Sequence, residues 1–169
     1  MPAIAGETRY FGKGYSPRGD KGRFVLPADF RAAVVAASEN RRILCLDKHP
    51  RLPCLVGFGT ARAERIVEEL IAEKTKASDN GRAFDLDLEL GLVSAFDSVS
   101  FDESGRFILP AYLGEQIHAD EGLYFHGAGL NIMLWAPAAL AAMPGEWDAV
   151  KAACRDQVAA NQSSRERRK

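Results

Sequence analysis

An α+β fold made of two tandem half-units is predicted by three features of the sequence. A seven-residue motif at residues 22–28 recurs 83 residues later at 105–111, with six of its seven positions identical. Each copy is followed by a helical pattern and then by two short apolar runs typical of strands. Each half continues into a longer amphipathic helical pattern. A repeat that occurs only twice, at this separation, indicates a duplicated half-domain rather than a solenoid.

Both copies of the motif have the same physical plan. A polar turn at residues 18–22 comes first, and its Asp and Gly fit a type I turn because Asp accepts bonds from nearby backbone N–H groups and Gly adopts positive φ. A short apolar strand is predicted over 23–26. The proline after it has no N–H and is best tolerated in the first turn of a helix, so a helix is predicted over 28–38. The second copy repeats the turn, strand and helix over 102–105, 106–109 and 111–119.

The other elements are predicted from hydrophobic periodicity. Short apolar runs predict strands over residues 42–46, 54–58, 122–126 and 131–135. Apolar positions at helical spacing predict helices over 61–76, 137–143 and 147–160, the last two separated by Pro144-Gly145. Between the halves, residues 84–90 alternate strictly between apolar and acidic, which predicts a half-buried strand with an acidic outer face.

These elements divide the chain into three parts. The first half-unit with its following helix is expected over residues 10–82 and the second over 83–160. The remaining residues, 161–169, form a basic tail that we expect to be disordered.

The composition is ordinary, but the charge is unevenly distributed. Apolar residues make up 47% of the 169 and the net charge is −1. Residues 1–31 carry six basic and three acidic side chains, and residues 163–169 carry four basic and one acidic, so the segment between them is acidic. Basic ends on an acidic body suggest one surface that faces an anion, although charges near chain ends also scatter freely.

Several classes of protein and site are not indicated. No apolar run is long enough to span a membrane, and residues 1–14 lack the apolar core of a signal peptide, so a cytoplasmic location is expected. The three cysteines have no paired spacing and are expected to be small apolar side chains in a reducing compartment. The histidines are isolated, at His49, His118 and His126. We therefore expect no metal, no cofactor and no enzymatic activity.

The doubled motif resembles the MraZ family of the wider AbrB-like group of transcription factors. The resemblance rests on Asp-Lys-Gly-Arg-Phe-Val-Leu-Pro at residues 20–27, Asp-Glu-Ser-Gly-Arg-Phe-Ile-Leu-Pro at 102–110 and the closing Leu-Trp-Ala-Pro at 134–137, and it covers roughly residues 10–150. It implies a pseudo-twofold, double-split barrel of swapped hairpins within one chain, with flanking helices. It also implies a ring-shaped homo-oligomer in the cytoplasm, associated with the nucleoid. This assembly would bind direct repeats of double-stranded DNA in the promoter of the division and cell-wall gene cluster.

The same resemblance implies which residues contact DNA. The matching basic positions are Lys21, Arg23 and Arg106. Arginine offers five donors in a planar fork that bridges phosphate oxygens or pairs with guanine, and lysine offers a movable point charge. The residues expected to shape and orient the turns are Asp20, Gly22, Asp102 and Gly105. Asp102 lies four residues before Arg106 and is placed to hold its guanidinium, whereas the alternative is that both arginines only pair with local acids.

The chain departs from the family pattern at three positions. Gly19 stands where the family has an acid, Gly114 where it often has an arginine, and Met133 where it has a glutamate. The function expected first is an oligomeric, sequence-specific DNA-binding transcriptional regulator. The alternative is an AbrB-like protein-interaction or antitoxin-type module, and a small enzyme is the weakest option.

Overall fold

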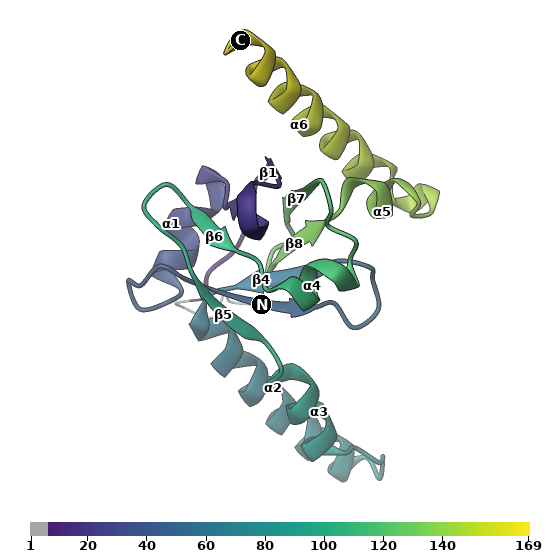
Figure 1. The fold of residues 1–169 in the computed structure, drawn as a ribbon. Helices are drawn as coiled ribbons and strands as arrows, with labels where there is room; N and C mark the ends of the chain where they lie inside the picture. The colour runs from purple at the N-terminus through teal and green to yellow at the C-terminus, as the bar shows by residue number, and fades with distance from the viewer. Residues whose placement is uncertain (1–6) are drawn as a thin grey trace.

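The computed structural model describes residues 7–169; residues 1–6, where the segment tested for a signal peptide begins, lie outside it. Its strands are β1 (Lys13–Pro17), β2 (Arg23–Val25), β3 (Ile43–Lys48), β4 (Leu55–Phe58), β5 (Asp97–Ser100), β6 (Arg106–Ile108), β7 (Gly122–Gly127) and β8 (Ile132–Trp135). Its helices are α1 (Ala28–Ala36), α2 (Thr60–Asp79), α3 (Leu86–Val93), α4 (Ala111–Gln116), α5 (Pro137–Ala141) and α6 (Asp148–Arg167). The predicted α+β class is confirmed, and the strands and helices predicted from each motif copy onward recur in order, while β1 and β5 were not predicted (Figure 1).

The strands form one six-stranded sheet and one two-stranded ribbon. The order in the sheet is β1-β7-β8-β4-β3-β5, and β2 pairs with β6 in the ribbon. The first half's β1 pairs with β7 of the second half, and the second half's β5 pairs with β3 of the first, while β4 and β8 meet in the centre. The equivalent strands of the two halves are β3 and β7, β4 and β8, and β1 and β5. Exchanging the members of each pair gives the same order read from the other end, so the sheet is pseudo-twofold symmetric.

The ribbon is held by matching contacts from the two copies of the motif. Leu26 donates its N–H to the Gly105 oxygen at 2.8 Å, and Leu109 donates to the Gly22 oxygen at 3.0 Å. Phe24 and Phe107 are almost fully buried beneath the ribbon, and the Phe107 ring meets Phe125 of the sheet edge-on at 6.4 Å. Burying each such ring contributes about 1.5–3 kcal/mol. This burial fixes which side of the ribbon faces solvent.

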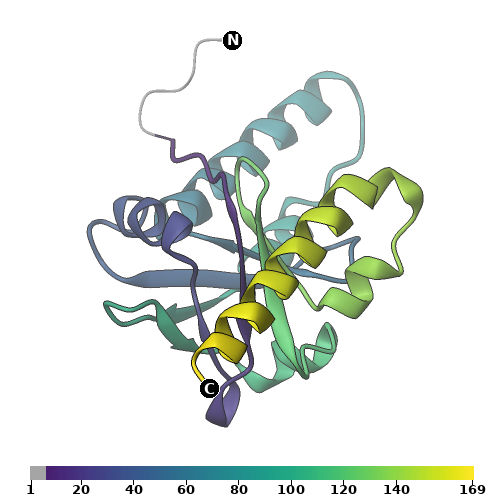
Figure 2. The same cartoon turned by 90° about the horizontal axis from the view of Figure 1, so that it is seen from above.

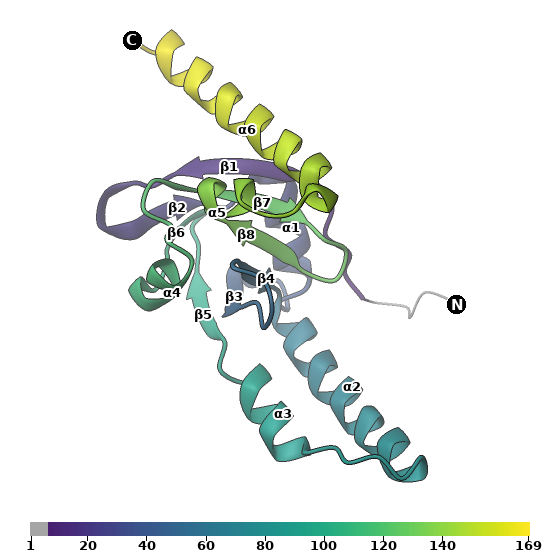
Figure 3. The same cartoon turned by 90° about the vertical axis from the view of Figure 1, so that its right-hand side faces the viewer.

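Helices extend from opposite ends of the sheet (Figures 1 and 3). α2 and α3 pack together and project away from the strands as an arm (Figure 3). α6 crosses β1 and β7 (Figure 2), and a second apolar cluster forms beneath it where Trp135 and Trp147 meet at 5.3 Å. No helix within residues 7–169 combines the length and apolar character needed to cross a membrane.

The predicted strand over residues 84–90 is wrong. These residues enter α3, and the Asp85 carboxylate caps the helix by accepting the Leu88 N–H at 3.0 Å. An Asp at this position satisfies an N–H that would otherwise lack a partner at the start of a helix. The neighbouring element is α2 rather than the edge of a sheet, so a strand here would find no partner. The alternating leucines instead lie on this short helix, where Leu86 and Leu90 are partly buried and Leu88 is exposed.

Two further expectations differ from the structure. The tail expected to be disordered continues α6 as far as Arg167, in line with the good helix propensity of Gln, Arg and Glu in this segment. The six-stranded sheet ends at β1 and β5, and the described strands show no pairing that closes it into a barrel. The predicted division after residue 82 falls in the connection between α2 and α3, and the half-unit boundaries remain a prediction.

Replacing Gly105 with Ala should lower the free energy of unfolding by about 2–4 kcal/mol. Gly105 has a φ of +87°, and a Cβ there would overlap the Arg31 side chain and the Leu26 oxygen. The matched control is Gly81→Ala, because Gly81 has a φ of +67° but a Cβ there meets no described atom within 4 Å. The control should cost only about 1 kcal/mol. Urea unfolding monitored by circular dichroism measures the free energy of unfolding of both variants. Equal losses of stability would show that the overlap at Gly105 adds nothing to the cost of a positive φ.

Candidate nucleic-acid interface

The outer face of the β2–β6 ribbon carries both arginines of the doubled motif. Arg23 lies opposite Ile108 and Arg106 lies opposite Val25. Partners in an antiparallel pair project to the same face, so Arg23 and Arg106 lie diagonally on one side of the ribbon. Both are exposed, whereas Phe24 and Phe107 occupy the buried face. The structure therefore brings together two of the three cationic residues that the sequence singled out.

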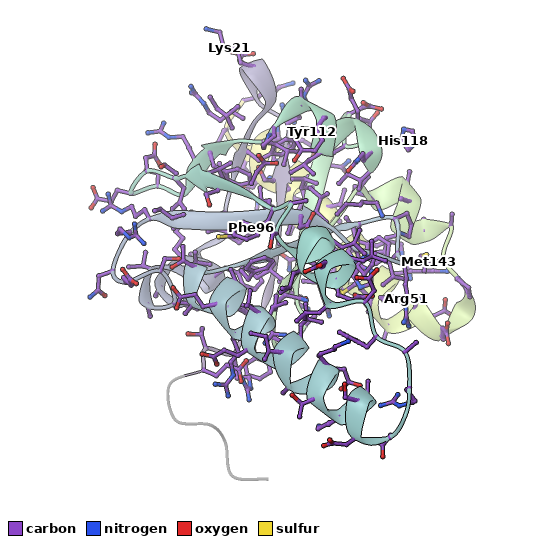
Figure 4. The ribbon with its side chains drawn as sticks, turned by 90° about the horizontal axis from the view of Figure 1, so that it is seen from below. Lys21, Arg51, Phe96, Tyr112, His118 and Met143 are labelled. Atoms are coloured by element: carbon purple, nitrogen blue, oxygen red, sulfur yellow. The ribbon has the colours of Figure 1, made fainter. Side chains whose placement is uncertain are left out.

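The first turn presents Lys21 to solvent. Lys21 and Gly22 follow each other with φ of 59° and 72°, which swings the backbone outward between β1 and β2. Figure 4 shows Lys21 at the outer tip of this turn, directed away from the body of the molecule. The Ser16 hydroxyl accepts the Val25 N–H at 2.8 Å and ties β1 to β2 behind the turn. Asp20 is exposed, and its carboxylate accepts no hydrogen bond within residues 7–169.

The second turn is organised by Asp102. One carboxylate oxygen accepts the N–H groups of Ser104 and Arg106 at 3.0 and 2.9 Å, and the other accepts Arg106 Nε at 2.7 Å. The Gly105 N–H donates to the Asp102 carbonyl oxygen at 2.9 Å, as the type I turn requires. The predicted orientation of Arg106 by Asp102 is thus seen in the structure. Because Nε alone is engaged, the outer N–H groups of the guanidinium are left for an anion.

These bonds also set the protonation of Asp102. The N–H groups of Arg106, backbone first and side chain second, hold the pKa of the Asp102 carboxyl below its ordinary value. The ion pair is therefore present at neutral pH and is lost as the pH falls through this lowered pKa. Arg23 differs, because it has no acidic partner among the residues that the structure describes. The alternative that both arginines pair with local acids therefore applies to Arg106 only.

Two arginines that the sequence reasoning missed extend this surface. Arg23, Arg106 and Ser100 line a shallow hollow of about 540 Å³. Arg41 and Arg42 line a second hollow of about 500 Å³, which borders Ser100 and Phe101 as the first does. The Arg41-Arg42 pair at the start of the strand predicted over 42–46 could have indicated this, but only the fold places it beside the other half's turn.

The opposite end of the ribbon carries acids at the equivalent place. Phe101 donates its N–H to the Arg42 oxygen at 3.1 Å, and the matching bond of the other half runs from Arg18 to the Glu121 oxygen at 2.8 Å. Arg41 and Arg42 thus correspond to Asp120 and Glu121. The backbone at these two places is related by the pseudo-twofold symmetry, but the side chains there have opposite charges. One end of the exposed face gains two cations, and the other gains two anions.

The remaining reactive side chains form no catalytic arrangement in the described part of the chain. Burial raises the pKa of the Cys54 thiol to about 12 and that of Cys154 to about 11, so both stay protonated at neutral pH. His126 contacts the Tyr124 hydroxyl at 2.8 Å, and His49 Nδ1 accepts the N–H groups of Arg51 and Leu52. Within residues 7–169, no cluster of three or more potential metal ligands is formed.

The chain is similar to bacterial proteins that carry the name Transcriptional regulator MraZ. It is 33% identical over 128 residues to the one from Rhodospirillum rubrum, which covers 74% of this chain and 77% of the relative. It is 30% identical over 126 residues to that of Parvibaculum lavamentivorans, covering 75% of this chain and 74% of the relative. The relative from Pseudomonas fluorescens is 29% identical over 133 residues, 79% of each chain. No family model matches the chain.

Replacing Arg106 with Gln should raise the pKa of Asp102 part of the way to its ordinary value. The side-chain bond and the positive charge are lost, while the backbone N–H groups of Ser104 and Arg106 remain as donors. A carboxyl titration by NMR on ¹³C-aspartate-labelled protein measures the change. Arg82→Gln, on the far arm, is the control and should leave Asp102 unchanged. An unaltered pKa in Arg106→Gln would show that the ion pair does not form in solution.

Proposed function

Because the chain belongs to the MraZ family, whose relatives are named transcriptional regulators, we propose that it regulates transcription by binding specific DNA through the β2–β6 ribbon. The observation that carries this proposal is the common outward face of Arg23 and Arg106. Lys21 adds a third cation at the tip of the adjoining turn. In this proposal the three residues contact DNA, and Gly22, Asp102 and Gly105 shape the turns that present them. Asp20 takes part through its backbone oxygen, which accepts the Arg23 N–H.

The dimensions of a ribbon suit this role. The major groove of B-DNA admits a two-stranded β-ribbon as well as a helix. Arg23 and Arg106 would pair with guanine or bridge phosphate oxygens, and Val25 and Ile108 beside them would meet thymine methyl groups. Val25 and Ile108 are 37% and 56% exposed beside the two arginines. A mixed polar and apolar face therefore supports base reading in addition to phosphate contact.

Assembly is the second part of the proposal. One ribbon offers few contacts, so affinity would come from several copies bound to one DNA at high effective concentration. We propose a ring-like homo-oligomer that binds direct repeats in the promoter of the division and cell-wall genes, with each chain folded as a double-split barrel. Such a protein would act in the cytoplasm at the nucleoid.

An AbrB-like protein-interaction module is the alternative, and the α2–α3 arm favours it. Leu88 and Leu92 of α3 are 55% and 60% exposed, and Asp87 lies beside them on a projecting helix. Neighbouring exposed apolar side chains can form a patch that contacts another protein. The arm and the ribbon are separate surfaces, so the DNA measurements below distinguish the two functions.

Arg23→Ala and Arg106→Ala should each weaken promoter binding by about 1–3 kcal/mol if a base is read. Lys21→Ala should act through phosphate and reduce the slope of log K against log salt by about 0.9. Fluorescence anisotropy with DNA from upstream of the protein's own gene, at several salt concentrations, measures both quantities. Arg82→Ala is the control, because Arg82 pairs with Glu73 on the distant arm.

Unchanged binding in both ribbon variants would exclude this face as the DNA site. Sedimentation velocity on the same samples reports how many copies bind one duplex. A single copy bound with full affinity would contradict the proposed gain from assembly.

Removing the charged side chains at the two ends of the ribbon face should change DNA affinity in opposite directions. Replacing Arg41 and Arg42 with Ser should weaken DNA binding and lower the salt slope, because two cations next to the Arg106 turn are removed. Replacing Asp120 and Glu121 with Ser, at the equivalent backbone positions, should strengthen binding, because two anions near Lys21 are removed. The two double variants control for each other, since both remove two charges. The same direction of change in both would contradict the proposed placement of DNA.

A further inference from the structure

Arg31 has an interior structural role in the first half. Its Nε donates to the Leu26 oxygen at 2.8 Å, and its guanidinium lies against Gly105 in the turn of the second half. The side chain therefore joins α1 to the end of β2 and to the opposing turn. The Leu26 carbonyl, which accepts this hydrogen bond, lies between the end of β2 and the proline that precedes α1.

The second half has the same backbone but lacks this side chain. Leu109 corresponds to Leu26 and Gly22 to Gly105, as their matching hydrogen bonds show. The position equivalent to Arg31 is Gly114, which has no side chain to offer the Leu109 oxygen. A pocket of about 150 Å³ is found here, lined by Gly22, Leu109 and Gly114.

The two equivalent places differ in the side chains at two positions. Glu115 and Asp120 line the pocket, whereas their counterparts near Arg31 are Ala32 and Arg41. The half that contains its own arginine thus has no acids at these positions, and the half without one has two. Arg18 and Lys21 also line the pocket, and all four charged side chains are exposed. The two basic side chains are long enough to carry their charged ends out into solvent, whereas the shorter carboxylates stay nearer the backbone.

We propose that this pocket is a binding site for a guanidinium group, which would occupy the place that Arg31 fills in the other half. The guanidinium would donate to the Leu109 oxygen and face the carboxylates of Glu115 and Asp120. Its planar set of donors matches a carbonyl and carboxylates, whereas an ammonium matches them less well. The group would come either from a free guanidinium compound or from an arginine of a second copy of this chain. The proposal does not depend on DNA binding.

Methylguanidinium is the probe, with methylammonium at the same concentration as the matched cation. TROSY NMR on the full chain labelled with ¹⁵N-glycine follows Gly22 and Gly114 at the pocket and Gly81 as a distant reference. Methylguanidinium should shift Gly22 and Gly114 saturably and leave Gly81 unmoved. The Glu115→Gln, Asp120→Asn double variant should bind roughly tenfold more weakly. Gly114→Arg should fill the pocket and abolish the shift of Gly22.

A Cβ at position 114 would approach the Leu109 side chain to 3.3 Å, a contact that a small movement relieves. The double variant, which leaves Gly114 intact, tests the site independently of whether Gly114→Arg folds. Equal shifts with methylammonium, or full affinity in the double variant, would overturn the proposal.

Sedimentation velocity separates the two sources. If Gly114→Arg reduces the number of copies in the assembly, an arginine of a second copy is the ligand. If the assembly is unchanged while methylguanidinium binding is lost, the ligand is a free guanidinium compound. Both results support the site, and they differ only in the origin of the group.

Discussion

Burial of Phe24 and Phe107 under the β2–β6 ribbon is the constraint on which the rest of the structure depends. Side chains alternate across a strand, so burying these rings forces Arg23 and Arg106 to the opposite face. A shift of one residue in register would bury two guanidinium groups and expose two aromatic rings. The hydrogen bonds from Leu26 to Gly105 and from Leu109 to Gly22 fix that register from both sides. The cationic face is therefore a direct consequence of core packing.

Local chemistry was predictable from the sequence, and long-range pairing was not. The spacing of Asp102 and Arg106 across a turn was enough to predict their ion pair. The acidic and apolar alternation at 84–90 was misleading, because an N-cap at Asp85 and the proximity of α2 outweighed the two-residue period. The exchange of β1 and β5 between the halves depends on contacts between distant residues, so no local pattern revealed it. Arg41 and Arg42 became part of the candidate site only through that exchange.

Duplication within one chain also allows the two halves to diverge. Two identical half-units joined as a dimer would present the same charges at both ends of the ribbon. In this chain the equivalent corners carry Arg41 and Arg42 at one end and Asp120 and Glu121 at the other. Arg31 and Gly114 differ in the same way in the interior. The backbone symmetry was retained while the surface and the space behind each turn changed.

This asymmetry bears on the arrangement of a DNA target. A protein with true twofold symmetry matches a palindromic site, because the symmetry of the operator mirrors that of the protein. A ribbon that has Arg41 and Arg42 beside one end and Asp120 and Glu121 beside the other has a direction, and successive copies placed head to tail along DNA would all point the same way. Direct repeats supply that geometry, whereas inverted repeats would require alternate copies to turn around. The unequal corners of the ribbon therefore give the proposed preference for direct repeats a physical basis in this chain's own residues.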